Sequence, residues 1–191
     1  MKKKIWNNCN KLKKYLQEIY PHRPIYLTSG GFDPLHIGHL RCIQGTSKLA
    51  TDLRRHPSAT KGITVIIVNG DGFLKRKKGY SFMNHEERME IISGIEGVDF
   101  VVGWDDGSQT VVGAIDILKP KYFTKGGDRT SADNVPEFKI CEEIKCEVIF
   151  NVGGGKIQSS SELVDKANSA EANELIGYAI GYQDGEKNAR K

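Results

Sequence analysis

The residues best suited to chemistry lie in one short segment, GGFDPLHIGH, at positions 30–39. Its two glycines let the backbone come close to a ligand, and His36 and His39 follow at the start of an amphipathic stretch. Side chains three residues apart on a helix face the same way, so both imidazoles can reach one ligand. A helix N-terminus also presents free N–H groups and a positive dipole end. The segment therefore predicts a polyphosphate site in which the imidazoles stabilise negative charge as it develops.

The elements that would position this segment alternate between short apolar runs and amphipathic stretches. The pattern predicts five strands, at residues 25–28, 63–68, 100–102, 122–124 and 147–150, separated by helices near residues 37–50, 85–95, 110–118 and 135–144. The second run is unbroken and β-branched, as in a strand covered on both faces. Helices between strands imply parallel crossovers. We therefore expect an α/β fold, a doubly wound, Rossmann-like parallel five-stranded sheet with helices on both faces.

The ends of the chain carry extra helical signals. An apolar stripe near the N-terminus consists of Ile5, Cys9, Leu12, Leu16 and Ile19. It predicts a basic amphipathic helix within residues 1–23, docked on its own domain, on a second subunit or on a membrane surface. Residues 24–165 would form the main domain, and residues 166–191 a helical tail with a frayed end.

The bulk composition excludes several classes of protein. With 191 residues the chain has room for one well-buried core. The net charge is +4, and residues 1–24 hold seven Lys or Arg and one Glu, which leaves 21 basic and 23 acidic residues in a nearly neutral body without a clustered basic face for nucleic acid. The four cysteines have neither zinc-site spacing nor a disulfide framework. No apolar run is long enough for a membrane span, so we expect a cytoplasmic protein.

The pattern GxFDxxHxGH resembles the signature of the HxGH nucleotidyltransferases, the cytidylyltransferase-like superfamily. The later motifs are most similar to those of the heptose 1-phosphate adenylyltransferases, which make ADP-heptose. These motifs are FLKRKKG at 73–79, NHEERMEII at 84–92, VDFVVGWDDGSQTVV at 98–112, KPKYFTKGGDR at 119–129 and GGKIQSSSEL at 154–163. They follow one another in the family's order over about residues 25–165. The first of them corresponds to a lysine-rich loop after the second strand.

The resemblance implies a role for each of the residues that match a motif. The expected nucleotide-binding residues are Thr28, Ser29, Gly30, Gly31, Phe32, Lys125, Gly126, Gly127, Asp128, Ser159, Ser160 and Ser161. The expected catalytic residues, which would bring donors and positive charge to the phosphates, are His36, His39, Lys78 and Arg88. Asp33 and Arg129 are the expected acceptor-binding residues, although Asp33 could instead orient its own turn. Lys75, Arg76 and Lys77 could belong to a solvated charged turn, and Arg88 could lie on the surface.

The implied reaction transfers a nucleoside monophosphate from an NTP to a phosphorylated small molecule and releases pyrophosphate. ATP and a sugar phosphate are the favoured substrates, and a cytidylyltransferase that uses CTP and a phosphoalcohol or phosphonate is the alternative. A nucleotide sensor without turnover is a further possibility. Mg²⁺ would be held mainly by the NTP phosphates, without a protein metal site. The resemblance is also compatible with a homodimer.

Overall fold

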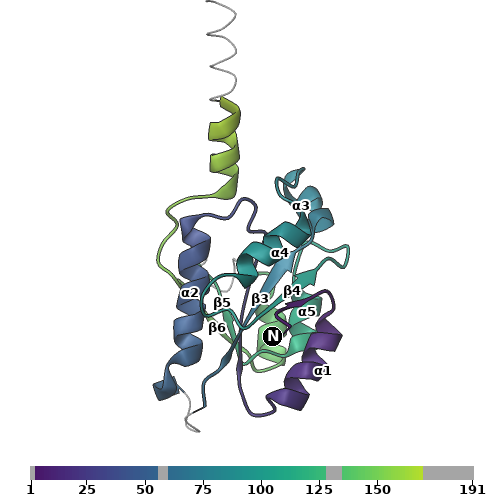
Figure 1. The fold of residues 1–191 in the computed structure, drawn as a ribbon, viewed down its shortest axis with the longest axis vertical. Helices are drawn as coiled ribbons and strands as arrows, with labels where there is room; N and C mark the ends of the chain where they lie inside the picture. Colours follow the sequence, from purple (N-terminus) through teal and green to yellow (C-terminus); the bar gives the residue numbers. More distant parts are fainter. Residues whose placement is uncertain (1–2, 56–59, 128–134, 170–191) are drawn as a thin grey trace, which may run out of the picture.

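The computed structural model describes residues 3–55, 60–127 and 135–169 and contains one sheet of six parallel strands (Figure 1). The strand order is β1-β4-β3-β2-β5-β6. The strands are β1 (Ile5–Trp6), β2 (Ile25–Gly30), β3 (Ile63–Asn69), β4 (Phe100–Trp104), β5 (Tyr122–Thr124) and β6 (Glu147–Ile149). The five predicted strands are confirmed. The order reverses direction between β2 and β5, the switch point of a doubly wound sheet.

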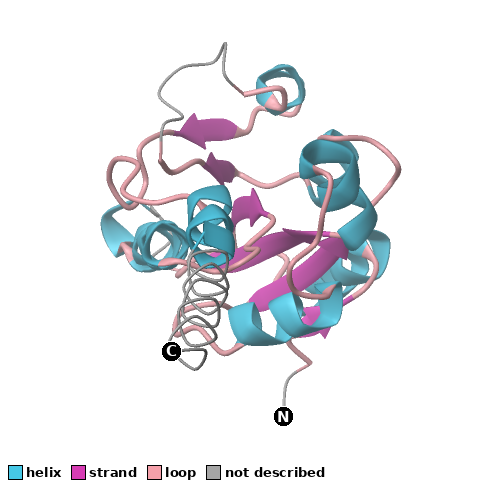
Figure 2. Ribbon diagram, turned by 90° about the horizontal axis from the view of Figure 1, so that it is seen from above, coloured by secondary structure: helices cyan, strands magenta, loops and turns pink. Residues whose placement is uncertain are grey.

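Helices cover both faces of this sheet, as predicted (Figure 2). The helices are α1 (Cys9–Ile19), α2 (Ile37–Thr51), α3 (Asp71–Lys78), α4 (His85–Ser93), α5 (Val112–Leu118) and α6 (Phe138–Glu143), with a short 3₁₀ turn at Leu53–Arg55. One core lies between the sheet and α1, α5 and α6, and a second lies beneath α2 and α4. Because every residue of β3 is buried, its unbroken apolar run matches a strand covered on both sides.

The sheet has one strand more than predicted because Ile5 does not belong to the first helix. The Asn8 side chain accepts a hydrogen bond from the backbone N–H of Lys11 and caps α1, so the helix begins at Cys9. The residues before this cap are extended and pair with β4, with Ile5 beside Val101. Of the other predicted stripe residues, Cys9, Leu12 and Leu16 are the buried residues of α1, whereas Ile19 at the end of the helix is 49% exposed. The helix docks on its own domain, beside α5.

The prediction of a lysine-rich loop at residues 73–79 is also wrong, because most of these residues form α3. This helix begins after Gly70 with Asp71 in its first turn and ends with four basic residues, charges that complement the helix dipole at both ends. Gly79, at φ 84°, then terminates it in the left-handed conformation that glycine adopts most easily. The lysines are therefore fixed on defined faces of a helix.

Residues 160–169 form a helix that projects from the body of the domain (Figure 1). It overlaps the predicted helical tail only at residues 166–169, and the rest of that tail lies outside the described residues. None of the described helices is long and apolar enough to cross a membrane.

Candidate active site

A pocket of about 350 Å³ opens at the carboxyl ends of the central strands. It lies beside the switch point between β2 and β5, where loops diverge and leave a crevice. Among the predicted site residues, those that line it are Thr28, Ser29, Gly30, Gly31, Phe32, His36, His39, Lys125, Gly126, Gly127, Ser159 and Ser160. The fold thus brings together three loops that are far apart in the sequence.

The two histidines form a stacked pair at the start of α2. Their ring centroids are 3.6 Å apart, and the rings are inclined by 21°. Nδ1 of His36 accepts hydrogen bonds from the backbone N–H groups of Gly38, at 3.1 Å, and His39, at 3.4 Å. Nδ1 of His39 in turn accepts from the backbone N–H of His36, at 3.4 Å. Since each Nδ1 is an acceptor, each neutral ring carries its proton on Nε2.

The environment keeps both rings neutral. Burial lowers the pKa of His36. Burial, with smaller contributions from the charges of His36 and Lys78, lowers the pKa of His39 to about 3. Two stacked imidazolium rings would repel each other strongly at this separation. The pocket therefore contains two neutral Nε2–H donors that an anionic ligand can use without a change in protonation.

The lowered pKa of His39 predicts a loss of stability in acid. Between pH 6.5 and about 3, the unfolded chain protonates this residue and the folded chain does not. The free energy of unfolding should therefore fall as the pH is lowered through this window. His39→Gln, which does not titrate, should give a shallower fall in urea denaturation at several pH values. Equal slopes for the two proteins would contradict the assignment.

Buried hydroxyl groups support the floor of the pocket. Thr28 donates to the carbonyl of Thr124 at 2.9 Å, and the hydroxyls of Thr46 and Thr124 lie 2.7 Å apart. Thr124 also donates to the carbonyl of Leu27 at 3.2 Å. These contacts join β2, β5 and α2 immediately below the histidine pair. Because buried hydroxyl groups are costly to leave unpaired, the network fixes the relative position of these three elements.

The loops after β5 and β6 fit closely against α2 because of glycines. A Cβ on Gly153 would lie 2.6 Å from backbone atoms of Arg41 and Cys42, and its φ of 87° is in the glycine-favoured region. A Cβ on Gly126 would lie 2.9 Å from the carbonyl oxygen of Val152. Only glycine permits both approaches. This side of the pocket is therefore lined largely by backbone.

One cation on this side is held by a carboxylate that the sequence analysis missed. Nζ of Lys125 lies 3.3 Å from Oε2 of Glu137, and both side chains are mostly buried and line the pocket. Oε1 of Glu137 accepts from the backbone N–H of Val111 at the start of α5. Glu137 thus connects α5 to the end of β5 and orients the ammonium group of Lys125.

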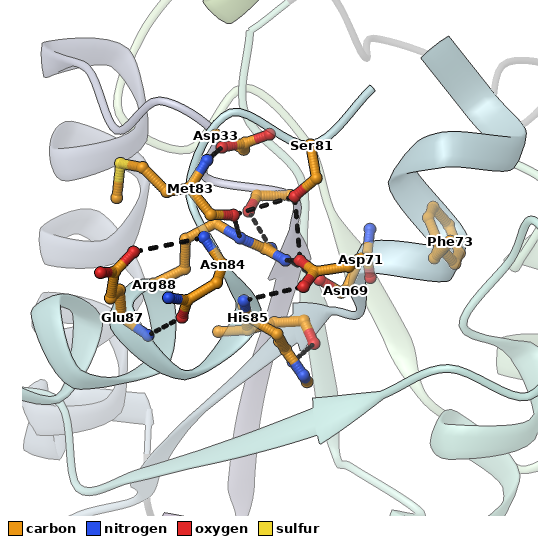
Figure 3. Close-up of polar contacts among 12 residues, drawn as sticks. Asp33, Asn69, Asp71, Phe73, Ser81, Met83, Asn84, His85, Glu87 and Arg88 are labelled. Carbon is orange, nitrogen blue, oxygen red and sulfur yellow. Dashed lines mark hydrogen bonds and ion pairs between the residues drawn. The ribbon is translucent and has the colours of Figure 1, made fainter. Parts of the chain in front are cut away.

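Arg88 lies behind the pocket wall and is 1 % exposed, so it is not a surface residue. Its guanidinium donates to the carbonyls of Met83, Gly31 and Asn69 and to the carboxylate of Asp71 (Figure 3). It is absent from the described pocket lining. Four of its five N–H donors are used within the protein, which leaves one for the expected contact with phosphate, and that contact stays a prediction. In this geometry Arg88 positions the glycine turn and the end of β3.

Asp71, the ionic partner of Arg88, is also held by several donors. Burial alone would raise its pKa, but hydrogen bonds from Arg88, Ser81 and the backbone of His85 hold the pKa below its usual value. Figure 3 shows these side chains converging on one carboxylate. The ion pair thus remains charged at neutral pH and joins α3 to α4.

Asp33 and Lys78 pair with each other and do not line the described pocket. The Asp33 carboxylate, 1 % exposed, accepts from the backbone N–H groups of Phe82 and Met83 at 2.8 and 2.7 Å. Lys78 lies 3.2 Å from it and donates to the carbonyl of Asp33 at 2.7 Å. These contacts favour the alternative, in which Asp33 orients its own turn, and its expected acceptor role stays a prediction.

The other side of the pocket is lined by residues that the sequence analysis did not assign to the site. They are Asn69, Phe73, Lys77 and Gln109, from the end of β3, from α3 and from the connection between β4 and α5. Lys77, and not Lys78, is the lysine of α3 that reaches the pocket. Oδ1 of Asn69 is buried and has no hydrogen-bond partner in the described part of the chain.

The serine segment divides between the pocket and the helix that follows. Ser159 accepts from the backbone N–H of Glu162 and caps residues 160–169. Ser160 donates to the carbonyl of Pro34 at 2.9 Å, which ties the segment to the histidine turn. Ser161 is exposed and is not among the described lining residues. Asp128 and Arg129 lie outside the described residues.

Residues 27–152 match the cytidylyltransferase-like family. The chain belongs to this family. The match begins in β2 and ends in the loop after β6, so it contains the histidine turn, Arg88 and the Lys125 loop. Across the described residues, no group of three or more His, Cys, Asp or Glu side chains is arranged to hold a metal ion.

Curated relatives share part of the chain. The bifunctional protein HldE of Hahella chejuensis is 32% identical over 140 residues, which cover 72% of this chain and 26% of that protein. HldE of Aliarcobacter butzleri is 29% identical over 144 residues, 74% of this chain and 27% of the relative. The chain thus spans about a quarter of the length of these proteins.

A solved structure shares the fold. It is the lipopolysaccharide core biosynthesis protein of Thermoplasma volcanium, with a TM-score of 0.54 and 20% identity over 67% of this chain and 95% of that chain. At this identity the likeness concerns the fold alone. It agrees with the doubly wound parallel sheet described above.

Proposed function

We propose that this chain is a nucleotidyltransferase that transfers a nucleoside monophosphate from an NTP to a phosphorylated acceptor. The observation that carries the proposal is the stacked pair His36 and His39, whose Nδ1 atoms accept backbone N–H groups so that Nε2–H remains for a ligand. Both rings line the pocket at the start of a helix of 15 residues. Membership of the cytidylyltransferase-like family supports the same reaction.

In this reaction a phosphate oxygen of the acceptor attacks the α-phosphorus of the NTP in line. A new P–O bond forms, the bond from the α-phosphorus to its bridging oxygen breaks, and pyrophosphate leaves with the electron pair. No covalent enzyme intermediate is needed, so the protein contributes orientation and charge stabilisation. The two Nε2–H donors would bind phosphate oxygens and strengthen as negative charge accumulates on the leaving group. Mg²⁺ bound to the NTP phosphates would neutralise part of that charge.

The two sides of the pocket suggest where each substrate binds. The backbone-lined side near Gly126, with Lys125 held by Glu137, suits the nucleotide. The opposite side offers the carboxamides of Asn69 and Gln109 and the ammonium group of Lys77. Carboxamides both donate and accept hydrogen bonds, as sugar hydroxyls do, and a lysine suits a phosphate. This division supports a sugar phosphate as the acceptor.

Similarity to the HldE proteins and to heptose 1-phosphate adenylyltransferase motifs favours ATP as the nucleotide. Pyrophosphate release should be measured with ATP, CTP, GTP and UTP against heptose and hexose 1-phosphates, glycerol 3-phosphate and phosphoethanolamine. We expect release with ATP and a sugar 1-phosphate. Activity confined to CTP and a phosphoalcohol would instead establish the cytidylyltransferase alternative. Nucleotide binding without release for any pair would indicate a sensor. Light scattering on the same preparation would test the expected dimer.

A further inference from the structure

A second pocket, of about 370 Å³, lies at the opposite end of the strands from the histidine pair. Its lining includes Ile25 at the start of β2 and Lys121 just before β5, so it opens at the amino ends of the strands. A strand of six residues separates it from the first pocket, a distance of roughly 20 Å. Leu16 and Ile144 contribute apolar surface to its walls.

Five cationic side chains surround this second pocket. They are Lys13, Arg23, Lys119, Lys121 and Lys145, and no Asp or Glu belongs to its described lining. They come from α1, the turn before β2, the α5–β5 connection and the α6–β6 connection, so folding and not a run of sequence brings them together. Like charges gathered on one concave surface repel each other unless an anion lies among them.

The protein's own groups satisfy only some of these cations. Nζ of Lys13 donates to the carbonyl of Leu118 at 2.6 Å, and Arg23 donates to the carbonyls of Lys61 and Gly62. Even so, burial and then the charge of Lys119 lower the pKa of Lys13, as expected where positive charge is in excess.

The three remaining lysines are more available. Lys119 pairs with Asp116 at 3.5 Å, but both side chains are more than half exposed, so the pair is weak. No described carboxylate forms an ion pair with Lys121 or Lys145, and both are exposed. Lys119 and Lys145 have φ of 46° and 57°, at positions after a helix where glycine is usual. A lysine at such a position is disfavoured relative to glycine.

We propose that this second pocket binds a small, multiply charged phosphate compound. Lysine ammonium groups are compact point charges that suit phosphate oxygens from several directions. The concave shape and the apolar wall favour a small organic phosphate or a polyphosphate over an extended polyanion. The site is separate from the catalytic pocket, and two of the basic residues of the N-terminal segment, Lys13 and Arg23, belong to its lining.

Pyrophosphate is the probe for this proposal, and amide chemical shifts of ¹⁵N-labelled full-length protein are the measurement. At constant ionic strength we expect saturable shifts in residues 13–25 and 119–121, separate from any shifts at residues 30–39. The double variant Lys121→Glu/Lys145→Glu should raise the Kd for pyrophosphate that the shifts in residues 13–25 and 119–121 report by about tenfold or more, because two charged contacts are lost. The shifts at residues 30–39 should persist, and they report on the catalytic pocket alone.

The matched control is Lys14→Glu/Lys48→Glu, which changes the net charge equally at two exposed lysines outside both described pocket linings. It should leave both sets of shifts nearly unchanged. The proposal is overturned if residues 13–25 and 119–121 do not respond to pyrophosphate, or if both double variants weaken the response equally. A response only to RNA or to acidic vesicles would assign the surface to a macromolecule and also overturn it.

Discussion

Replacing His39 with alanine should lower kcat by about 10²–10³-fold and change KM for the NTP by only about a few-fold. The reason is that its Nε2–H would bind most strongly where charge develops in the transition state. The ring is partly buried and neutral, so the substitution removes a fixed donor without leaving an unpaired charge. Pyrophosphate release with the best NTP and acceptor pair is the measurement.

Two further substitutions at His39 test which ring nitrogen acts. The amide nitrogen of glutamine can occupy the place of Nε2, whereas that of asparagine lies closer to the place of Nδ1. Because Nδ1 accepts the backbone N–H of His36, we expect His39→Gln to recover part of the lost rate and His39→Asn to recover none. Equal rates for the two variants would contradict the assigned tautomer. Near-normal activity of His39→Ala would contradict the catalytic role itself.

His36 should behave differently because it has two functions. Its Nδ1 caps α2, so His36→Ala should lower the free energy of unfolding by about 1 kcal/mol in addition to slowing the reaction. The comparison of thermal midpoints separates the two histidines. An unchanged midpoint for His36→Ala would show that the cap contributes little.

The features that sequence analysis predicted correctly are those with local causes. His36 and His39 are close in sequence, and the reciprocal capping contacts at the start of α2 bring their rings together without any distant part of the chain. Likewise, the β-branched run of β3 reports its own burial. In contrast, β1 has only two residues, too few for a period of two to be recognised. Its identity as a strand depends on pairing with β4, far along the chain.

The sequence could not indicate which lysine of α3 lines the described pocket, for a geometric reason. Lys77 and Lys78 are neighbours on α3, and neighbouring side chains of a helix point about 100° apart. Composition could indicate that this segment supplies a cation to the site, but it could not indicate which one. Only the packing of α3 beside Asp33 decides that Lys78 pairs with a carboxylate and Lys77 lines the pocket.

Glu137 was missed because its role depends on long-range contacts. Its partners are Val111, 26 residues earlier, and Lys125 at the end of another strand. A single glutamate just before an amphipathic helix is common in protein sequences and does not mark a site. The stretch around it has no glycine pair or histidine pattern that would mark a site. Its burial beside a lysine becomes visible only once the sheet is assembled.

The contacts of Arg88 are likewise long-range, and its replacement by methionine should cause the largest loss of stability. Its partners Gly31, Asn69 and Asp71 lie 57, 19 and 17 residues away, so no local pattern could show that its donors are already occupied. Arg88→Met would leave three carbonyls and one carboxylate without this donor. Asp71 is partly exposed, so most of the cost comes from leaving the three carbonyls unpaired, and we expect a loss of about 3 kcal/mol. The thermal midpoint should then fall by roughly 6–12 °C.

The controls for this prediction separate positioning from direct contact with substrate. Arg54→Met removes an arginine that pairs with Asp52 at the surface, and it should not change the midpoint. Arg88→Lys keeps the charge but cannot reach four acceptors from one nitrogen, so it should fall between wild type and Arg88→Met. If Arg88→Met fails to fold, the same ordering is tested with Arg88→Lys and Asp71→Asn.

Because Arg88 holds Gly31, its loss should also raise KM for the NTP. A variant with normal stability and no activity would instead place Arg88 on the phosphates and contradict the positioning role.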